Sequence, residues 1–156
     1  MNAPRLLGEV RGDFLFSARV TVDFQSTYDA GVLLAYTDER NRAKLCFKFS
    51  PPRQPMVVGV VTRGLSDDCN SFVVDGPRVW LRIARIGRAF AFHASTDGTL
   101  WQFVRLFALG SASPPLVGFS AQAPTGEGCT TTFDEIAFTA TTLEDLRNGA
   151  QSAGGS

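Results

Sequence analysis

Six side chains could contribute to ligand binding because of their chemistry and their spacing. They are Lys44, Lys48, Trp80, Arg82, His93 and Gln122, and each alternates with apolar residues in a strand-like run. An aromatic plane can stack on the C–H face of a sugar, and charged or amide groups give directional hydrogen bonds to hydroxyls. If neighbouring strands carry all six in one sheet, they would line its concave face. A solvated sheet surface remains the favoured interpretation for each residue taken alone.

The acidic residues lack the spacing that a hydrolase would need. A retaining glycosidase places two carboxyl groups on one surface, roughly 5–5.5 Å apart. Asp134 and Glu135 are adjacent in the chain, so their side chains point to opposite faces of a strand. Asp67 and Asp68 are adjacent too. His93 has no nearby Ser or Cys in a nucleophile turn, so we predict no catalytic residue.

Three consecutive runs between Val79 and Leu106 must position several of these side chains. Apolar residues alternate with other residues through the first two runs, and Trp101, Phe103 and Arg105 are expected to share one side of the third. The dipeptide Asp97-Gly98 separates the last two runs and is a strong hairpin signal. We expect Asp97 to fix this turn through its side chain and Gly98 to adopt a positive φ.

Further strand-like runs on both sides of this meander bring the total to about nine or ten. One begins at Phe14 and ends at Phe24, while residues 63–77 are expected to be mainly loop, with Phe72–Val74 as a possible short strand. Short strands separated by Gly- and Pro-rich turns favour two packed antiparallel sheets. We therefore divide the chain into a lead-in at 1–11, a β-sandwich at 12–141, and a short helix with a flexible tail at 142–156.

Composition narrows the range of partners. Fifteen basic residues balance fifteen acidic ones, which gives no electrostatic footprint for nucleic acid or for an anionic membrane. The sequence shows neither a secretory signal nor a run long enough to span a bilayer. Three widely spaced cysteines and one histidine favour a reducing compartment over disulfides or a metal centre. These features predict a cytoplasmic protein without a cofactor.

Several motifs in order resemble a known family. They are Gly12-Asp13-Phe14, Tyr28-Asp29-Ala30-Gly31-Val32-Leu33-Leu34, Val60-Val61-Thr62-Arg63-Gly64-Leu65-Ser66-Asp67, Trp80-Leu81-Arg82-Ile83-Ala84-Arg85, Ser95-Thr96-Asp97-Gly98 and Trp101. Together they resemble uncharacterised domains labelled "regulation of enolase protein", within the concanavalin-A-like lectin/glucanase superfamily. The chain departs from that pattern at Asp68, where the family tends to carry a tryptophan.

The resemblance implies an all-β, concanavalin-A-like jelly-roll sandwich in which carbohydrate binding is common. We therefore expect a non-catalytic module that binds carbohydrate through the six side chains named above. A glycan-processing hydrolase or lyase of the same superfamily is an alternative. It ranks second because the glucanase pattern Glu-x-Asp-x-x-Glu is missing. An intracellular protein-interaction domain, or a homodimer formed through edge strands, is another. Relatives of this fold also suggest a weak calcium site at Glu9, Asp13 and Asp134.

Overall fold

The computed structural model describes residues 5–110, 113–123, 126, 128–146 and 150–151. Its strands are β1 (Arg5–Glu9), β2 (Phe14–Asp23), β3 (Ala30–Asp38), β4 (Asn41–Phe49), β5 (Pro55–Arg63), β6 (Leu65–Val73), β7 (Arg78–Ile86), β8 (Ala89–Ser95), β9 (Gln102–Ala108), β10 (Leu116–Gln122), β11 (Thr130–Thr139), β12 (Leu143–Asp145) and β13 (Ala150–Gln151). In this described part of the chain, no helix is long and apolar enough to cross a bilayer.

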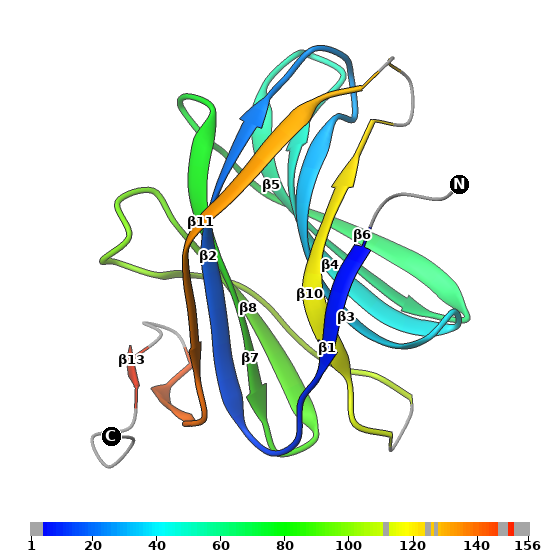
Figure 1. The fold of residues 1–156 in the computed structure, drawn as a ribbon, viewed down its shortest axis with the longest axis vertical. Coiled ribbons are helices and arrows are strands. Elements are labelled where there is room, and N and C mark those ends of the chain that lie inside the picture. The colour runs from blue at the N-terminus through cyan, green and yellow to red at the C-terminus, as the bar shows by residue number, and fades with distance from the viewer. Residues whose placement is uncertain (1–4, 111–112, 124–125, 127, 147–149, 152–156) are drawn as a thin grey trace.

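Two antiparallel sheets pack face to face (Figure 1). The six-stranded sheet has the order β1-β10-β3-β4-β5-β6, and the five-stranded sheet has the order β11-β2-β7-β8-β9. Strands β12 and β13 form a separate small ladder. The predicted all-β jelly-roll sandwich of the concanavalin-A-like class is confirmed.

Alternation along the strands builds the core between the sheets. In β2, Phe14, Ala18 and Val20 are fully buried and face the other sheet, as the period of two predicts. Leu45 and Phe47 of β4 meet them from the six-stranded sheet. Large apolar side chains removed from water in this way supply the main driving force for folding.

Two central expectations were wrong. Residues 65–73 form the full edge strand β6 rather than a loop, because they pair with β5 through backbone hydrogen bonds that need no apolar side chains. In β9 a bulge shifts the register, so that Phe103 lies opposite His93 whereas Arg105 lies opposite the core residue Phe92. Phe103 and Arg105 therefore do not share a face. A bulge adds one residue to the strand and breaks the simple alternation.

The ends of the chain also differ from expectation. The lead-in at 1–11 contains β1, which pairs with β10 and extends the six-stranded sheet. A helix was predicted at the start of the segment 142–156, but residues 142–146 form a connection that contains the short strand β12, whose Leu143 packs on Leu15 and Ala84 of the five-stranded sheet. Tertiary contact with an apolar surface overrides a weak helical signal. Apart from β13, the expected flexible tail at 148–156 lies outside the described residues.

The turn after β8 matches its prediction. The carboxylate of Asp97 accepts hydrogen bonds from the backbone N–H groups of Thr99, at 2.8 Å, and Leu100, at 2.9 Å. These bonds hold the pKa of Asp97 below its usual value, because they stabilise the ionised form. Gly98 has a φ of 81°. The Asp-Gly pair therefore has a structural role.

Candidate binding face

The six predicted ligand-binding residues lie on two different sheets. Trp80 and Arg82 lie on β7 and His93 lies on β8, all within the five-stranded sheet. The other three, Lys44, Lys48 and Gln122, belong to β4 and β10 of the six-stranded sheet. Both groups point away from the shared core, and the two outer faces of a sandwich point in opposite directions. One concave face cannot contain all six.

Arg82 and His93 are neighbours, as predicted, but they are buried rather than exposed. They form a cross-strand pair, with 3% of Arg82 and none of His93 accessible to solvent. The guanidinium carbon of Arg82 lies 4.4 Å from the centre of the Trp101 ring. Burial lowers the pKa of His93 to about 4 and that of Arg82 to about 10, because desolvation penalises the charged forms.

The C-terminal segment covers this outer face of the five-stranded sheet. The backbone carbonyl oxygen of Leu146 lies 2.6 Å from His93 Nε2, and Leu143 and Leu146 both pack on the sheet. Trp80 is only half-buried, and its indole N–H donates to Glu135 at 2.7 Å. The expectation that Trp80, Arg82 and His93 form an exposed surface is wrong, because residues distant in sequence pack over Arg82 and His93.

The other three residues lie on the outer face of the six-stranded sheet, hereafter the binding face. Strand register places Gln122 opposite Ala30, Ala30 opposite Lys48, and Lys48 opposite Met56, in one row across four strands. Lys44 lies four residues before Lys48 on the same side of β4, about 13 Å away at the usual rise of a strand. The sheet therefore presents two lysines and an amide on one surface.

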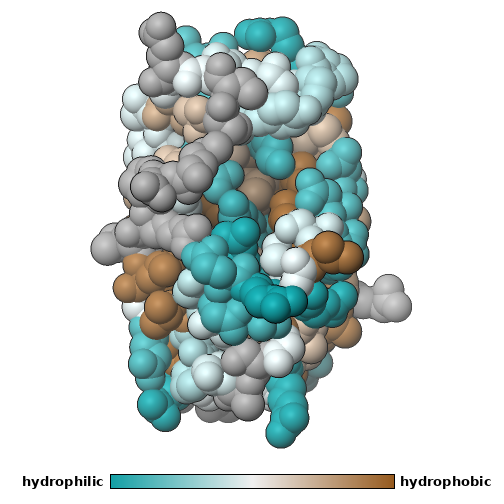
Figure 2. Space-filling model, turned by 90° about the vertical axis from the view of Figure 1, so that its right-hand side faces the viewer, coloured by the Kyte–Doolittle hydropathy of each residue, from teal (hydrophilic) through white to brown (hydrophobic). Residues whose placement is uncertain are grey.

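Small apolar side chains lie between these polar groups. Ala30, Val32, Cys46 and Val58 are at most 4% exposed, although they point away from the main core. Seen from this side, hydrophobic atoms form the floor of a hollow and hydrophilic side chains border it (Figure 2). Burial also raises the pKa of the Cys46 thiol. A neutral, buried thiol is a packing group rather than a nucleophile.

Ser120 supplies a polar atom within this apolar surface. Its side chain is 3% exposed, and register places it opposite Val32 on β3. The hydroxyl has no hydrogen-bond partner among the residues that the structure describes. A buried hydroxyl without a partner is costly, so such a group is suited to a bound water or to a ligand hydroxyl.

Tyr28 is a candidate that the sequence analysis did not single out. It is 41% exposed, and its ring lies 5.9 Å from the ammonium group of Lys48. Its φ of 70° lies in the left-handed region, where a bulky residue is a genuine outlier. Backbone strain of this kind tends to cluster at functional sites. The sequence offered one signal for it, its place at the head of the motif Tyr28-Asp29-Ala30-Gly31.

Asp29 orders the loop that carries Tyr28. The Asp29 side chain is fully buried, and its Oδ2 accepts hydrogen bonds from the backbone N–H groups of Gln25, at 2.9 Å, and Ser26, at 2.8 Å. The backbone N–H of Tyr28 donates to the carbonyl of Phe49 at 2.7 Å. The loop is thus attached to the end of β4, beside Lys48.

The three acidic residues suggested as calcium ligands each have another partner in the structure. Glu9 pairs with Arg11, Asp13 accepts a hydrogen bond from the Gly87 backbone N–H at 2.8 Å, and Asp134 pairs with Arg19. Glu9 and Asp134 lie on different sheets. No cluster of three or more His, Cys, Asp or Glu side chains able to hold a metal occurs in the described part of the chain. The three weak calcium candidates are therefore not brought together.

Proteins of known structure share this two-sheet architecture. A functionally unknown protein from Saccharomyces cerevisiae matches with a TM-score of 0.81 and 27% identity, over 88% of this chain and 75% of that one. A xylan beta-1,4-xylosidase from Bacillus halodurans C-125 matches with a TM-score of 0.74 and 13% identity, over 88% of this chain but only 30% of the enzyme.

An alginate lyase from Alteromonas sp. 272 matches with a TM-score of 0.61 and 10% identity, over 81% of this chain and 71% of the lyase. At such low identity, the two enzymes share only the fold with this chain. No curated protein matches the sequence. One family model covers residues 1–141, and its description does not carry the label "regulation of enolase protein", so that label is not confirmed. The chain therefore belongs to the family described as "Protein of unknown function (DUF1349)".

Proposed function

We propose that the protein is a non-catalytic carbohydrate-binding module whose ligand lies on the binding face, at its Tyr28 end. The observation that carries this proposal is the exposed Tyr28 ring, which lies beside Lys48 on a strained backbone, in a loop that the buried Asp29 carboxylate orders. Holding a side chain in place before the ligand arrives reduces the entropy lost on binding.

The chemistry around Tyr28 suits a sugar. The phenol ring can stack on the C–H face of a pyranose, while Lys48 and Gln122 donate hydrogen bonds to its hydroxyls. Two matched structures bear the names of enzymes that act on polysaccharides, a xylosidase and an alginate lyase, which makes carbohydrate the first ligand class to test.

A catalytic role receives less support. Asp67 is engaged in an ion pair with Arg105. The hydrogen bond and ion pair with Arg19 lower the pKa of Asp134, which favours an ionised carboxylate over a general acid. His93, the only histidine, is buried under the C-terminal segment. A glycan hydrolase or lyase therefore remains the alternative.

The proposal can be tested by screening the folded chain on a glycan array and titrating the best hits by calorimetry. Tyr28→Ala and Lys48→Ala should each weaken binding about tenfold, which corresponds to roughly 1.4 kcal/mol. Tyr28→Phe should retain binding because it keeps the ring. Leu100→Ala serves as the matched control, since it removes an exposed apolar side chain attached to the other sheet.

Two results would count against this function. One is a folded protein that binds no glycan on the array. The other is equal affinity of the wild type, Tyr28→Ala and Lys48→Ala for a glycan that does bind. Release of shortened products from a bound oligosaccharide would instead favour the enzymatic alternative.

Strand β6 supports a second candidate, a protein-interaction role. It is an edge of the six-stranded sheet, and its first residue, Leu65, is 87% exposed. An exposed edge can pair with a strand of another chain or of a second copy. If β6 forms a homodimer, sedimentation should detect concentration-dependent association that Leu65→Lys abolishes. Association unaffected by Leu65→Lys, or none at high concentration, would oppose this candidate.

A further inference from the structure

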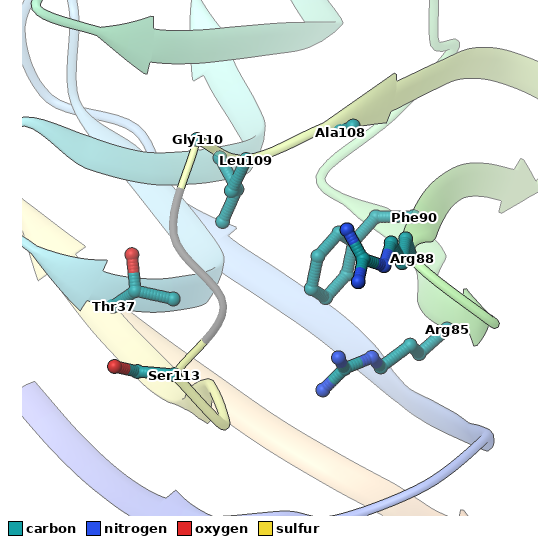
Figure 3. Close-up of a pocket in the computed structure, with 8 residues that line it drawn as sticks. All are labelled: Thr37, Arg85, Arg88, Phe90, Ala108, Leu109, Gly110 and Ser113. Carbon is teal, nitrogen blue, oxygen red and sulfur yellow. The ribbon is translucent and has the colours of Figure 1, made fainter.

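A separate pocket of about 460 Å³ opens at one end of the sandwich (Figure 3). It lies between the end of β3 at Thr37, the β7–β8 hairpin at Arg85 and Arg88, and the connection from β9 to β10 at Leu109. The binding face described above ends near Ala30, at the start of β3. The pocket and the Tyr28 site therefore lie at opposite ends of this strand.

Arg85 faces inward, which is unusual for a charged residue in a sandwich. Register pairs it with Phe14 and Phe90, both core residues, so it continues the inward side of β7. Its guanidinium carbon lies 5.5 Å from the centre of the Phe90 ring, and its Nε donates to the Gly87 carbonyl at 3.1 Å. This arrangement orients the guanidinium while most of its N–H groups stay available.

Arg88 comes from the turn of the same hairpin and is drawn beside Arg85 in the close-up (Figure 3). No carboxylate among the described residues forms an ion pair with either arginine. None of the described residues that line the pocket is acidic. One carboxylate, that of Asp13, lies beside the same hairpin, where it accepts a hydrogen bond from the Gly87 backbone N–H. The two guanidinium groups therefore leave the site with a net positive charge. Their planar N–H pairs match the oxygen pairs of carboxylate and phosphate groups.

The wall of the pocket opposite the two arginines indicates which other groups a ligand would need. The Thr37 hydroxyl already donates to the Asn41 carbonyl at 2.7 Å, so its oxygen can only accept a further hydrogen bond. A hydroxyl on the ligand could supply that donor, and Leu109 adds an apolar contact. The volume also exceeds what an inorganic ion would fill.

We propose that this pocket binds a small hydroxylated organic anion, whose carboxylate or phosphate group is held by Arg85 and Arg88. The proposal does not rest on sugar binding at Tyr28, because no residue is shared between the two sites.

The test titrates the ¹⁵N-labelled full chain by NMR, at constant ionic strength, with glucuronate, glucose 6-phosphate and glucose. The three probes share a sugar body and differ in the anionic group. Saturable shifts at the amides of Thr37, Gly110 and Ser113 are expected with one or both anions, and glucose should produce none. The stronger of the two anions identifies which group the arginines prefer.

Variants assign the effect to the two arginines. Arg88→Gln removes an exposed charge and should weaken anion binding at least tenfold. Arg85→Lys keeps the charge but loses the planar fork, so it should also weaken binding several-fold without emptying the core position. Arg78→Gln, an exposed residue at the other end of β7, is the matched control.

Equal shifts with glucose and with the anions would overturn the proposal, as would anion binding that both arginine variants leave unchanged. The Tyr28→Ala variant should bind the anions as the wild type does. Loss of glycan binding with retained anion binding, or the reverse, therefore separates the failure of one site from that of the other.

Discussion

The imidazole Nε2 of His93 lies 2.6 Å from the backbone carbonyl oxygen of Leu146. Because a carbonyl can only accept, Nε2 must carry the proton of the neutral ring. The bond joins the middle of β8 to the C-terminal segment, and Leu143 adds apolar contact nearby. The sequence suggested His93 as a ligand contact, but in the structure it binds the C-terminal segment that covers the sheet.

His93 should make stability depend on pH. Its pKa is about 4 in the folded protein and about 6.5 when unfolded, mainly because burial disfavours the charged ring. Between pH 6.5 and pH 4, the unfolded chain therefore binds a proton at His93 that the folded chain does not bind. The contribution of His93 to the free energy of unfolding is constant above pH 6.5 and is lost as pH falls toward 4. The loss is about 3 kcal/mol at 1.36 kcal/mol per pKa unit.

Urea denaturation of the wild type and His93→Gln at pH 7 and pH 4 measures this loss. Glutamine can donate a similar hydrogen bond but does not titrate, so the wild type should lose about 3 kcal/mol more than the variant. Carboxylates titrate in both proteins and cancel in the comparison. Parallel losses in the two proteins would rule out His93 as the source.

Gly31 should resist enlargement because the two sheets approach closely there. A Cβ added at Gly31 would lie 2.5 Å from Val20 Cγ1 and 2.8 Å from Thr131 Cγ2. Gly31→Ala should therefore lower the free energy of unfolding by roughly 1–3 kcal/mol through overpacking. Chemical denaturation gives the value directly.

Gly59→Ala is the matched control, because Gly59 faces the same core from β5. Its added Cβ would lie 3.5 Å from Phe92 Cδ2, an ordinary contact. This variant should stay within about 1 kcal/mol of the wild type. Similar losses at Gly31 and Gly59 would contradict the close approach inferred for Gly31.

Gly98 should be more sensitive to alanine than Gly64, although their backbones are nearly alike. Their φ angles are 81° and 83°, so alanine meets similar strain at both, roughly 1–2 kcal/mol. At Gly98 the new Cβ would also lie 2.9 Å from Trp80 Cε2, whereas at Gly64 the nearest atom is the flexible Arg40 Nη2 at 3.7 Å. In thermal unfolding, Gly98→Ala should have a lower melting temperature than Gly64→Ala. The opposite order would refute the Trp80 contact.

Arg82 and Trp101 should be energetically coupled. The guanidinium carbon lies 4.4 Å from the ring centre and Arg82 is almost fully buried, conditions under which a cation–π contact can contribute about 2 kcal/mol. A double-mutant cycle with Arg82→Met and Trp101→Leu isolates this pair from the other contacts of Arg82. Additive losses of stability in the double variant would show that the contact contributes nothing.

The sequence was most informative where a local rule has only one structural outcome. The alternation that begins at Phe14 predicted a strand buried on one side, because successive side chains of an extended chain point to opposite faces. Asp97-Gly98 predicted its turn for a similar reason, since the carboxylate reaches the next backbone N–H groups and glycine permits a positive φ. Local order of this kind determined the all-β class and most strand positions.

The binding face was decided by tertiary structure. Lys48 and His93 occupy equivalent outward positions in their strands, yet Lys48 is only half-buried, beside the Tyr28 ring, and His93 lies beneath Leu146. Alternation tells which residues avoid the core, but it does not tell which sheet receives each strand or which outer face a distant segment covers. Those outcomes depend on contacts between residues far apart in the chain, and the pairing of Arg85 with Phe14 at the end of the sandwich is another of them.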